Sequence, residues 1–270
     1  MRTHQIHQAA HKMLNPISLD ALRAKAPAIF SERPAPTVSK EYEFIPTSRV
    51  LERLVNQHGF QIVQVSQEKA KSEDRMGFQR HMIKLTRDDL RIGDDIAQVI
   101  ISNAHDATAA FRIMAGVFRA ACHNGLVVGS FAMNRVIRHV DIEEGAIDAV
   151  YRIIDDVPQI TNDINVMKNT IINDDQALEL AMTAAELRWG KEAPEKIDPM
   201  DLLRIHRKED MGLDLWTNFN VIQENTVGGG FKMIKRMKNG AANTVRKLET
   251  VGENLSVNEK LWNAAFGMVK

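Results

Sequence analysis

Three short apolar segments separated by polar turns place the strongest constraint on the fold of this chain. The segments are Phe60–Val65, Phe78–Leu85 and Ile96–Ile101. Runs of this length that end in polar or glycine-containing turns are typical of β-strands. The intervening stretches, Gln67–Gly77 and Thr86–Asp95, are short, so hairpins are the simplest connection. The sequence therefore predicts an antiparallel β-meander.

Helical periodicity flanks this meander on both sides. Thr47 is expected to cap a helix with an apolar stripe that includes Val50 and Leu54, and Gly59 suits a left-handed C-terminal end. From Glu143 onward, apolar residues recur at steps of three and four. We therefore expect an α+β fold, an antiparallel β-meander with packed helices, followed by a mainly helical C-terminal half.

The segment after the third strand is harder to assign. We expect Phe111–Met114 to extend a strand and Gly116–His123 to form a helix that ends at Asn124–Gly125. Leu126–Val128 and Phe131–Val140 are expected to be extended. In the polar turn before this segment, local side-chain bonds of Asn103 and Asp106 would account for both residues.

The chain is expected to contain three parts. Residues 1–46 hold five of the eight prolines and are predicted to form an N-terminal arm that does not fold alone. Residues 47–142 form the predicted α+β core. Residues 143–270 form the predicted helical region, which includes a basic, glycine-containing segment at 228–248.

Composition narrows the class of protein. A chain of 270 residues with 44% apolar content is long enough for a sizeable core. The single cysteine excludes an internal disulfide and a cysteine-rich zinc site. There is no apolar run of about 18 residues, as a membrane-spanning helix requires, and the first residues lack the apolar core of a secretory signal. Cytoplasmic residence without membrane contact is expected.

Charge is unevenly distributed although the formal net charge is zero. Ala107–Val140 contains four arginines and two histidines without a carboxylate, and Phe231–Leu248 contains six Lys or Arg residues without an acid. Asp141–Leu187 contains eleven carboxylates against Arg152 and Lys168. The basic segments suggest an anionic partner. The alternative is that all these segments are solvated faces.

No catalytic or metal-binding pattern can be assembled from spacing. The triglycine Gly228–Gly230 lacks the lysine position of a nucleotide-binding P-loop and acts either as a hinge or as a phosphate contact. His105 and Asp106 could form an acid–base pair, but a local turn explains them more simply. The chain is therefore expected to be non-enzymatic, without cofactor or metal.

Three segments carry a resemblance to a known family. They read SKEYEFIPTSRVLERLVNQHGF from Ser39, SNAHDATAAFRIMAGVFRAACHNGLVVG from Ser102 and LWTNFNVIQENTVGGGF from Leu215. This chain resembles domain-of-unknown-function family 932, the phage- and plasmid-borne proteins also called phage/plasmid-like proteins, from roughly Ser39 to the C-terminus. His123 stands where the pattern favours a small polar residue. The resemblance implies a mobile-element context rather than a reaction.

The first functional hypothesis is a non-catalytic protein that binds nucleic acid, with single-stranded DNA annealing or recombination as its specific role. The order of elements is similar to that of the Red-beta class of phage annealing proteins, which form homo-oligomers on DNA. Exposed sheet edges, together with a proline-rich arm that can pack on a neighbouring copy, lead us to expect a homo-oligomer. If Gly116–His123 is helical, Arg119 and His123 could grip one phosphate together; the alternative is that Arg119 pairs with an acid. Alternation on the second strand suggests a basic sheet face.

The residues expected to contact phosphates are Arg80, Lys84, Arg112, Arg119, His123, Arg135, Arg138, Lys232, Lys235, Arg236, Lys238, Arg246 and Lys247. Phe111 and Phe131 are expected to stack on bases.

The second hypothesis is a protein-binding module. The acidic stretch Asp141–Leu187 would act as a nucleic-acid mimic that binds a host protein and counteracts a host defence system. Tight protein association without DNA binding would distinguish this hypothesis from the first. The formal net charge of zero and the aromatic content of 6% count against a strong nucleic-acid binder, so both hypotheses stay open.

Overall fold

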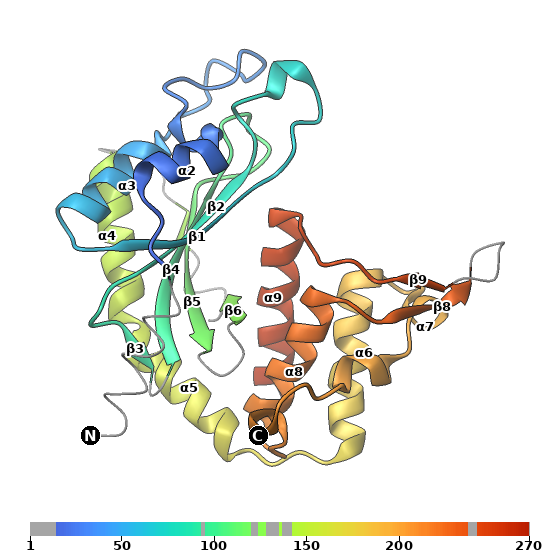
Figure 1. Cartoon of the computed structure of the whole chain (residues 1–270). Helices are drawn as coiled ribbons and strands as arrows, with labels where there is room; N and C mark the ends of the chain where they lie inside the picture. The colour runs from blue at the N-terminus through green and yellow to red at the C-terminus, as the bar shows by residue number, and fades with distance from the viewer. Residues whose placement is uncertain are drawn as a thin grey trace. The chain divides into compact units, whose positions relative to one another are not determined.

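A computed structural model describes residues 15–92, 95–119, 124–127, 135–136, 142–236 and 242–269. The chain divides into two compact units, unit 1 (Met1–Pro158) and unit 2 (Gln159–Lys270). Figure 1 shows a sheet with helices in the first and a group of helices in the second. The boundary predicted at residues 142 and 143 coincides with the start of a helix, whereas the compact units divide later in the chain.

Unit 1 is built on an antiparallel sheet with strand order β1-β2-β4-β5-β6. The strands are β1 (Gln61–Gln67), β2 (His81–Thr86), β4 (Asp95–Asn103), β5 (Arg112–Arg119) and β6 (Asn124–Val127). The short strands β3 (Arg91–Ile92) and β7 (Arg135–Val136) pair with β4 and β5. The predicted meander of three strands corresponds to β1, β2 and β4, so the α+β prediction is confirmed.

The predicted helix at Gly116–His123 is wrong, because residues up to Arg119 belong to β5. This strand pairs with β4 through seven residue pairs, from Ile96 opposite Phe118 to Ser102 opposite Arg112. An alanine- and glycine-containing apolar segment is ambiguous by periodicity alone. Pairing with the buried strand β4 satisfies its backbone groups, and this tertiary contact decides the conformation.

Both faces of β2 are covered, so the predicted basic sheet face is wrong for this strand. All six residues from His81 to Thr86 are buried. Lys84 is only 4% exposed. Sequence alternation separates the two faces of a strand, but it does not show whether the second face is solvated.

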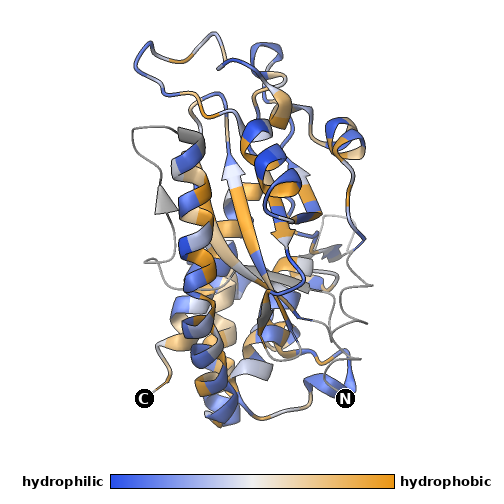
Figure 2. Cartoon of the chain, turned by 90° about the vertical axis from the view of Figure 1, so that its left-hand side faces the viewer, coloured by the Kyte–Doolittle hydropathy of each residue, from blue (hydrophilic) through white to orange (hydrophobic). Residues whose placement is uncertain are grey.

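Helices cover the sheet of unit 1. They are α2 (Leu19–Lys25), α3 (Thr47–Asn56) and α4 (Ile142–Asp155), with short 3-10 turns η1 (Pro27–Phe30) and η2 (Glu73–Arg75). Helix α4 contacts β4 and β5, and α3 contacts α4. Figure 2 shows the apolar side of α4 toward the strands, in agreement with buried Ile147 and Val150 and exposed Asp148.

The described part of the predicted N-terminal arm packs on unit 1 itself. Leu22 and Ile29 are fully buried. The amide of Ile17 donates to the Ile62 carbonyl at 2.7 Å, and the amide of Ala35 donates to the His105 carbonyl at 2.8 Å. These bonds add an edge contact to β1 and enclose the turn after β4, so the segment belongs to the core of its own unit.

Unit 2 is mainly helical, as predicted. Its elements are α5 (Val157–Asn169, which begins just before the boundary), α6 (Asp174–Trp189), α7 (Ala193–Lys196), η4 (Pro199–Leu203), η5 (Lys208–Asp210), α8 (Leu215–Gly228), β8 (Lys232–Arg236), β9 (Ala242–Thr244) and α9 (Val251–Phe266). Helices α6, α8 and α9 pack on one another.

The core of unit 2 is aromatic. Trp262 lies 5.8 Å from Phe219, and Phe219 lies 5.7 Å from Trp216, between ring centroids. Asp214 accepts a bond from the Thr217 amide and so caps the N-terminus of α8, which is almost wholly buried. Within the described ranges, no helix has both the length and the apolar character needed to cross a bilayer.

Candidate nucleic-acid interface

In the basic segment of unit 2, residues 231–236 and 242–248 form two paired antiparallel strands with their flanks, which we call the basic hairpin. Lys232 pairs with Thr244 and Arg236 pairs with Ala242 across the strands. Lys232, Arg246 and Lys247 are exposed, and Lys232 Nζ donates to Thr244 Oγ1 at 2.7 Å. Among the ion pairs between described residues, none involves these three cations. Lys232, Arg246 and Lys247 thus present positive charge that no described carboxylate neutralises through an ion pair.

Glycine allows the hairpin to start directly at the end of α8. Gly229 has a φ of 67°, and a Cβ there would lie 2.6 Å from the Val245 carbonyl oxygen. The amide of Gly229 donates to the Asn225 carbonyl, and the amide of Gly230 donates to the Val245 carbonyl. Because both amides already have protein acceptors, the triglycine works here as a close-packed turn rather than as a phosphate loop.

Gly229→Ala is expected to destabilise unit 2 by about 1–3 kcal/mol, because a side chain there is strained by φ and collides with backbone. Gly228→Ala is the matched control, since a Cβ at this helical position meets nothing within 4 Å; its effect should be neutral or slightly stabilising. Urea unfolding followed by tryptophan fluorescence measures this, because all three tryptophans (189, 216 and 262) lie in unit 2. Equal midpoints for the two variants would contradict the close-packing role.

Arg188 holds the base of the hairpin, although sequence reasoning did not identify it. Its two terminal nitrogens donate to the backbone carbonyls of Thr226 and Arg246, which joins α6 to α8 and to the hairpin. The guanidinium carbon lies 4.6 Å from the ring centroid of Trp189. Burial lowers the pKa of Arg188, and the charge of Glu253 opposes this shift. Arginine still stays protonated at neutral pH, so this half-buried charge positions the hairpin.

The described cations predicted in unit 1 are largely enclosed. Arg80 is half-buried and donates through Nη2 to the Thr108 carbonyl at 2.7 Å, and Arg112 is half-buried at the start of β5. Lys84 and Arg119 are 4% and 7% exposed, and neither is without a partner. Phe111 is 4% exposed and presents no face on which a base could stack. Lys84, Arg119 and Phe111 are therefore not part of the candidate interface, which the basic hairpin forms.

Several predicted residues lie outside the described part of the structure. They are His123, Phe131, Arg138 and Lys238, together with the side chains of Arg135, Lys235 and Arg236. The shared helical face predicted for Arg119 and His123 is wrong in any case, because Arg119 lies on a strand.

A second polar site, the buried polar cluster, consists of Thr47, His81, Asn103 and His105 in unit 1. Thr47 Oγ1 lies 3.0 Å from His81 Nε2 and 3.2 Å from His105 Nε2, and Asn103 Nδ2 donates to it at 3.0 Å. His81 Nδ1 lies 3.1 Å from the Gln79 carbonyl oxygen. Neutral rings are compatible with these contacts: Thr47 donates to His81 and accepts from Asn103 and His105, while the buried Nδ1 of His105 has no hydrogen-bond partner among the described residues.

The cluster also corrects the predicted cap. Pro46 is the N-cap of α3, and Thr47 uses its hydroxyl in the buried cluster instead. Burial lowers the pKa of His81 to about 3, with a further contribution from His105, and burial lowers the pKa of His105 to about 4. These neutral, solvent-excluded imidazoles join α3 to the ends of β2 and β4.

The turn after β4 has the predicted local bonding at Asp106, whereas the Asn103 side-chain amide donates to the distant Ile45 carbonyl and Thr47 hydroxyl. The Thr108 amide and hydroxyl both donate to Asp106 Oδ1, at 3.1 and 2.6 Å. Asp106 Oδ2 lies 3.8 Å from Arg75. The carboxylate is therefore engaged in its own turn rather than with the His105 ring. Over the described residues, no three histidine, cysteine or acidic side chains gather as a metal site would require.

Comparisons with known proteins agree with the family resemblance. The model of the family described as "Domain of unknown function (DUF932)" matches residues 35–262. UPF0380 protein YafZ of Escherichia coli (strain K12) is 29% identical over 255 residues, covering 94% of this chain and 92% of that protein. UPF0380 protein YfjQ of the same organism is 29% identical over 248 residues, covering 92% and 89%. No solved structure shows a significant match.

Proposed function

Starting from the membership of this chain in the DUF932 family, we propose that it is a non-catalytic nucleic-acid-binding protein that contacts phosphates through its basic hairpin. The observation that carries this proposal is the exposure of Lys232, Arg246 and Lys247 on a hairpin whose whole segment has six cations and no acid. Such a hairpin attracts a polyanion, and binding is strengthened because counterions are released from the polyanion.

The narrower form of the proposal is single-stranded DNA annealing or recombination in a phage or plasmid context, with the protein in the cytoplasm. The mobile-element context comes from the family resemblance. Phosphate contacts alone carry no sequence information. We therefore expect binding with little sequence preference and no nucleotide hydrolysis.

Photo-cross-linking tests the proposal and locates the contact. A single-stranded oligonucleotide with 5-iodouracil is irradiated with the full-length protein, and the modified peptides are identified by mass spectrometry. We expect adducts in peptides from residues 231–248. Adducts confined to unit 1, or none at low salt, would contradict the proposal.

The second candidate function, a protein-binding module that counteracts a host defence, is favoured by a different observation. Exposed carboxylates recur along α4, at Glu144 and Asp148, and along α6, at Asp174, Asp175 and Glu179. Either of these acidic helix faces, taken by itself, would mimic a phosphate backbone for a host protein. The cross-linking experiment separates the two functions, because the mimic would not itself bind nucleic acid.

A further inference from the structure

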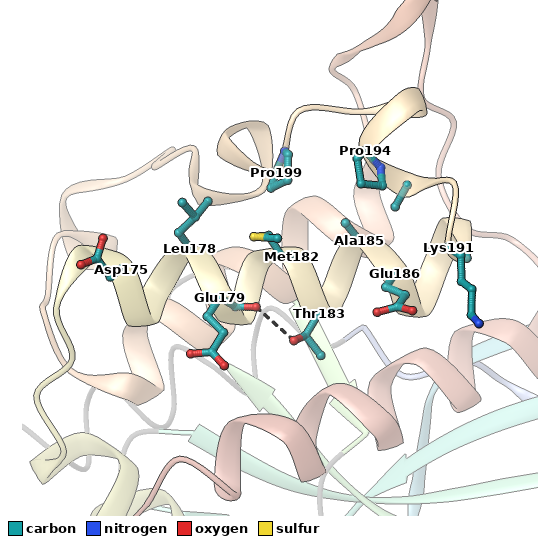
Figure 3. A pocket seen from close by; sticks show the side chains of 12 residues that line it. Asp175, Leu178, Glu179, Met182, Thr183, Ala185, Glu186, Lys191, Pro194 and Pro199 are labelled. Atoms are coloured by element: carbon teal, nitrogen blue, oxygen red, sulfur yellow. Dashed lines mark hydrogen bonds between the residues drawn. The ribbon is translucent and has the colours of Figure 1, made fainter.

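An apolar groove of about 500 Å³ lies along the exposed side of α6 in unit 2. Figure 3 shows Leu178, Met182 and Ala185 on the side of the helix that faces Pro194 and Pro199. Met182 is 53% exposed. An apolar surface held open to water is typical of a binding site, and methionine adapts well to the shape of a partner.

The rim of this groove is acidic. Asp175, Glu179 and Glu186 line it against one amine, that of Lys191. Figure 3 shows Glu179 and Glu186 along the edge of α6 away from the two prolines. None of the ion pairs found between described side chains uses these three carboxylates. The ligand that fits this groove is therefore an apolar side chain flanked by cationic side chains.

The basic hairpin presents that chemistry. Ile234 is 52% exposed. Exposed Lys232 lies two residues before it on β8. Ile234 and Met182 both remain exposed within one chain, so the hairpin does not fill the groove of its own molecule. We propose that the acid-rimmed groove binds the basic hairpin of a second copy of this chain.

This association would be head-to-tail. Each copy offers one groove and one hairpin, so every contact joins the hairpin of one copy to the groove of another. Contacts of this type build open chains or rings, and the smallest ring, in which two copies exchange hairpins, is a two-fold dimer. The inference does not require nucleic acid, and its test contains none, so it stands or falls separately from the proposed function.

A mixing experiment with two variants tests the groove–hairpin contact. Met182→Asp places a charge in the groove, and Ile234→Asp places one on the hairpin. Light scattering of the unmodified protein is expected to show a mass that rises with concentration from that of one chain to that of a dimer or a larger assembly. Each variant alone should associate at least about tenfold more weakly, because a buried unpaired carboxylate costs more than about 1.4 kcal/mol.

An equimolar mixture of the two variants should form dimers and nothing larger, because it retains one intact groove and one intact hairpin per pair. Met76→Asp, at a 65% exposed position in unit 1, is the matched control and should associate like the unmodified protein. Circular dichroism checks that each variant is folded. A monomeric unmodified protein, variants that associate normally, or a mixture that stays monomeric would each overturn the proposal.

Discussion

Neutralising Lys232, Arg246 and Lys247 together by glutamine is expected to lower the affinity for single-stranded DNA by about 100-fold at about 0.1 M salt. Each lost phosphate contact removes about 0.7 from the slope of log affinity against log salt, and three contacts remove about 2. The three residues are exposed, so their replacement should leave the fold intact. Fluorescence polarisation with a labelled oligonucleotide measures the loss.

The control for this triple variant changes the same net charge in unit 1. Lys25, Lys40 and Lys69 are exposed there, and their replacement by glutamine should weaken binding only slightly, through the long-range field. Equal losses for the two triple variants would mean that net charge, rather than the hairpin, determines affinity.

Acidification from about pH 7 to about pH 5 is expected to lower the unfolding free energy of unit 1 by a few kcal/mol. The pKa values of His81 and His105 fall from 6.5 to about 3 and about 4 in the folded protein. Below pH 6.5 the unfolded chain therefore binds more protons than the folded protein. The contribution of the two histidines to stability is fully present above pH 6.5 and declines as the pH falls toward 4. Each imidazole contributes up to roughly 1 kcal/mol per pH unit in this window.

Urea unfolding across this pH range provides the measurement. Circular dichroism reports both units, whereas tryptophan fluorescence reports unit 2 alone, so the difference isolates unit 1. His81→Asn removes one titrating group and should reduce the pH slope by about half, whatever its effect on absolute stability. A variant slope equal to that of the unmodified protein would show that the buried polar cluster does not cause the pH dependence.

Apolar run length and turn spacing were sufficient to predict the sheet and the helical half. Strands β1, β2 and β4 lie within a few residues of their predicted positions, and Gly59 has the expected positive φ, 69°. The failure at β5 has a physical reason. Its apolar run is compatible with both the helical and the strand period. Only the pairing with β4, which the local sequence pattern does not show, distinguishes the two conformations.

The candidate interface was only partly predictable. The charge pattern located the basic segment, but it could not show that Lys84 and Arg119 are buried, because coverage of a sheet face depends on elements elsewhere in the chain. The structural role of Arg188 depends on carbonyls of Thr226 and Arg246, far away in sequence. Likewise, the position of Thr47 matched a helix cap, whereas its buried histidine partners come from β2 and from the turn after β4.

The salt dependence of binding tests the central claim most directly. The unmodified protein is titrated against labelled single-stranded DNA, duplex DNA and RNA by fluorescence polarisation over a salt series. We predict an affinity that falls with salt, with a slope of about −2 or steeper on the single strand, as three phosphate contacts require. Absence of binding to all three nucleic acids at low salt, or an affinity independent of salt, would contradict the account.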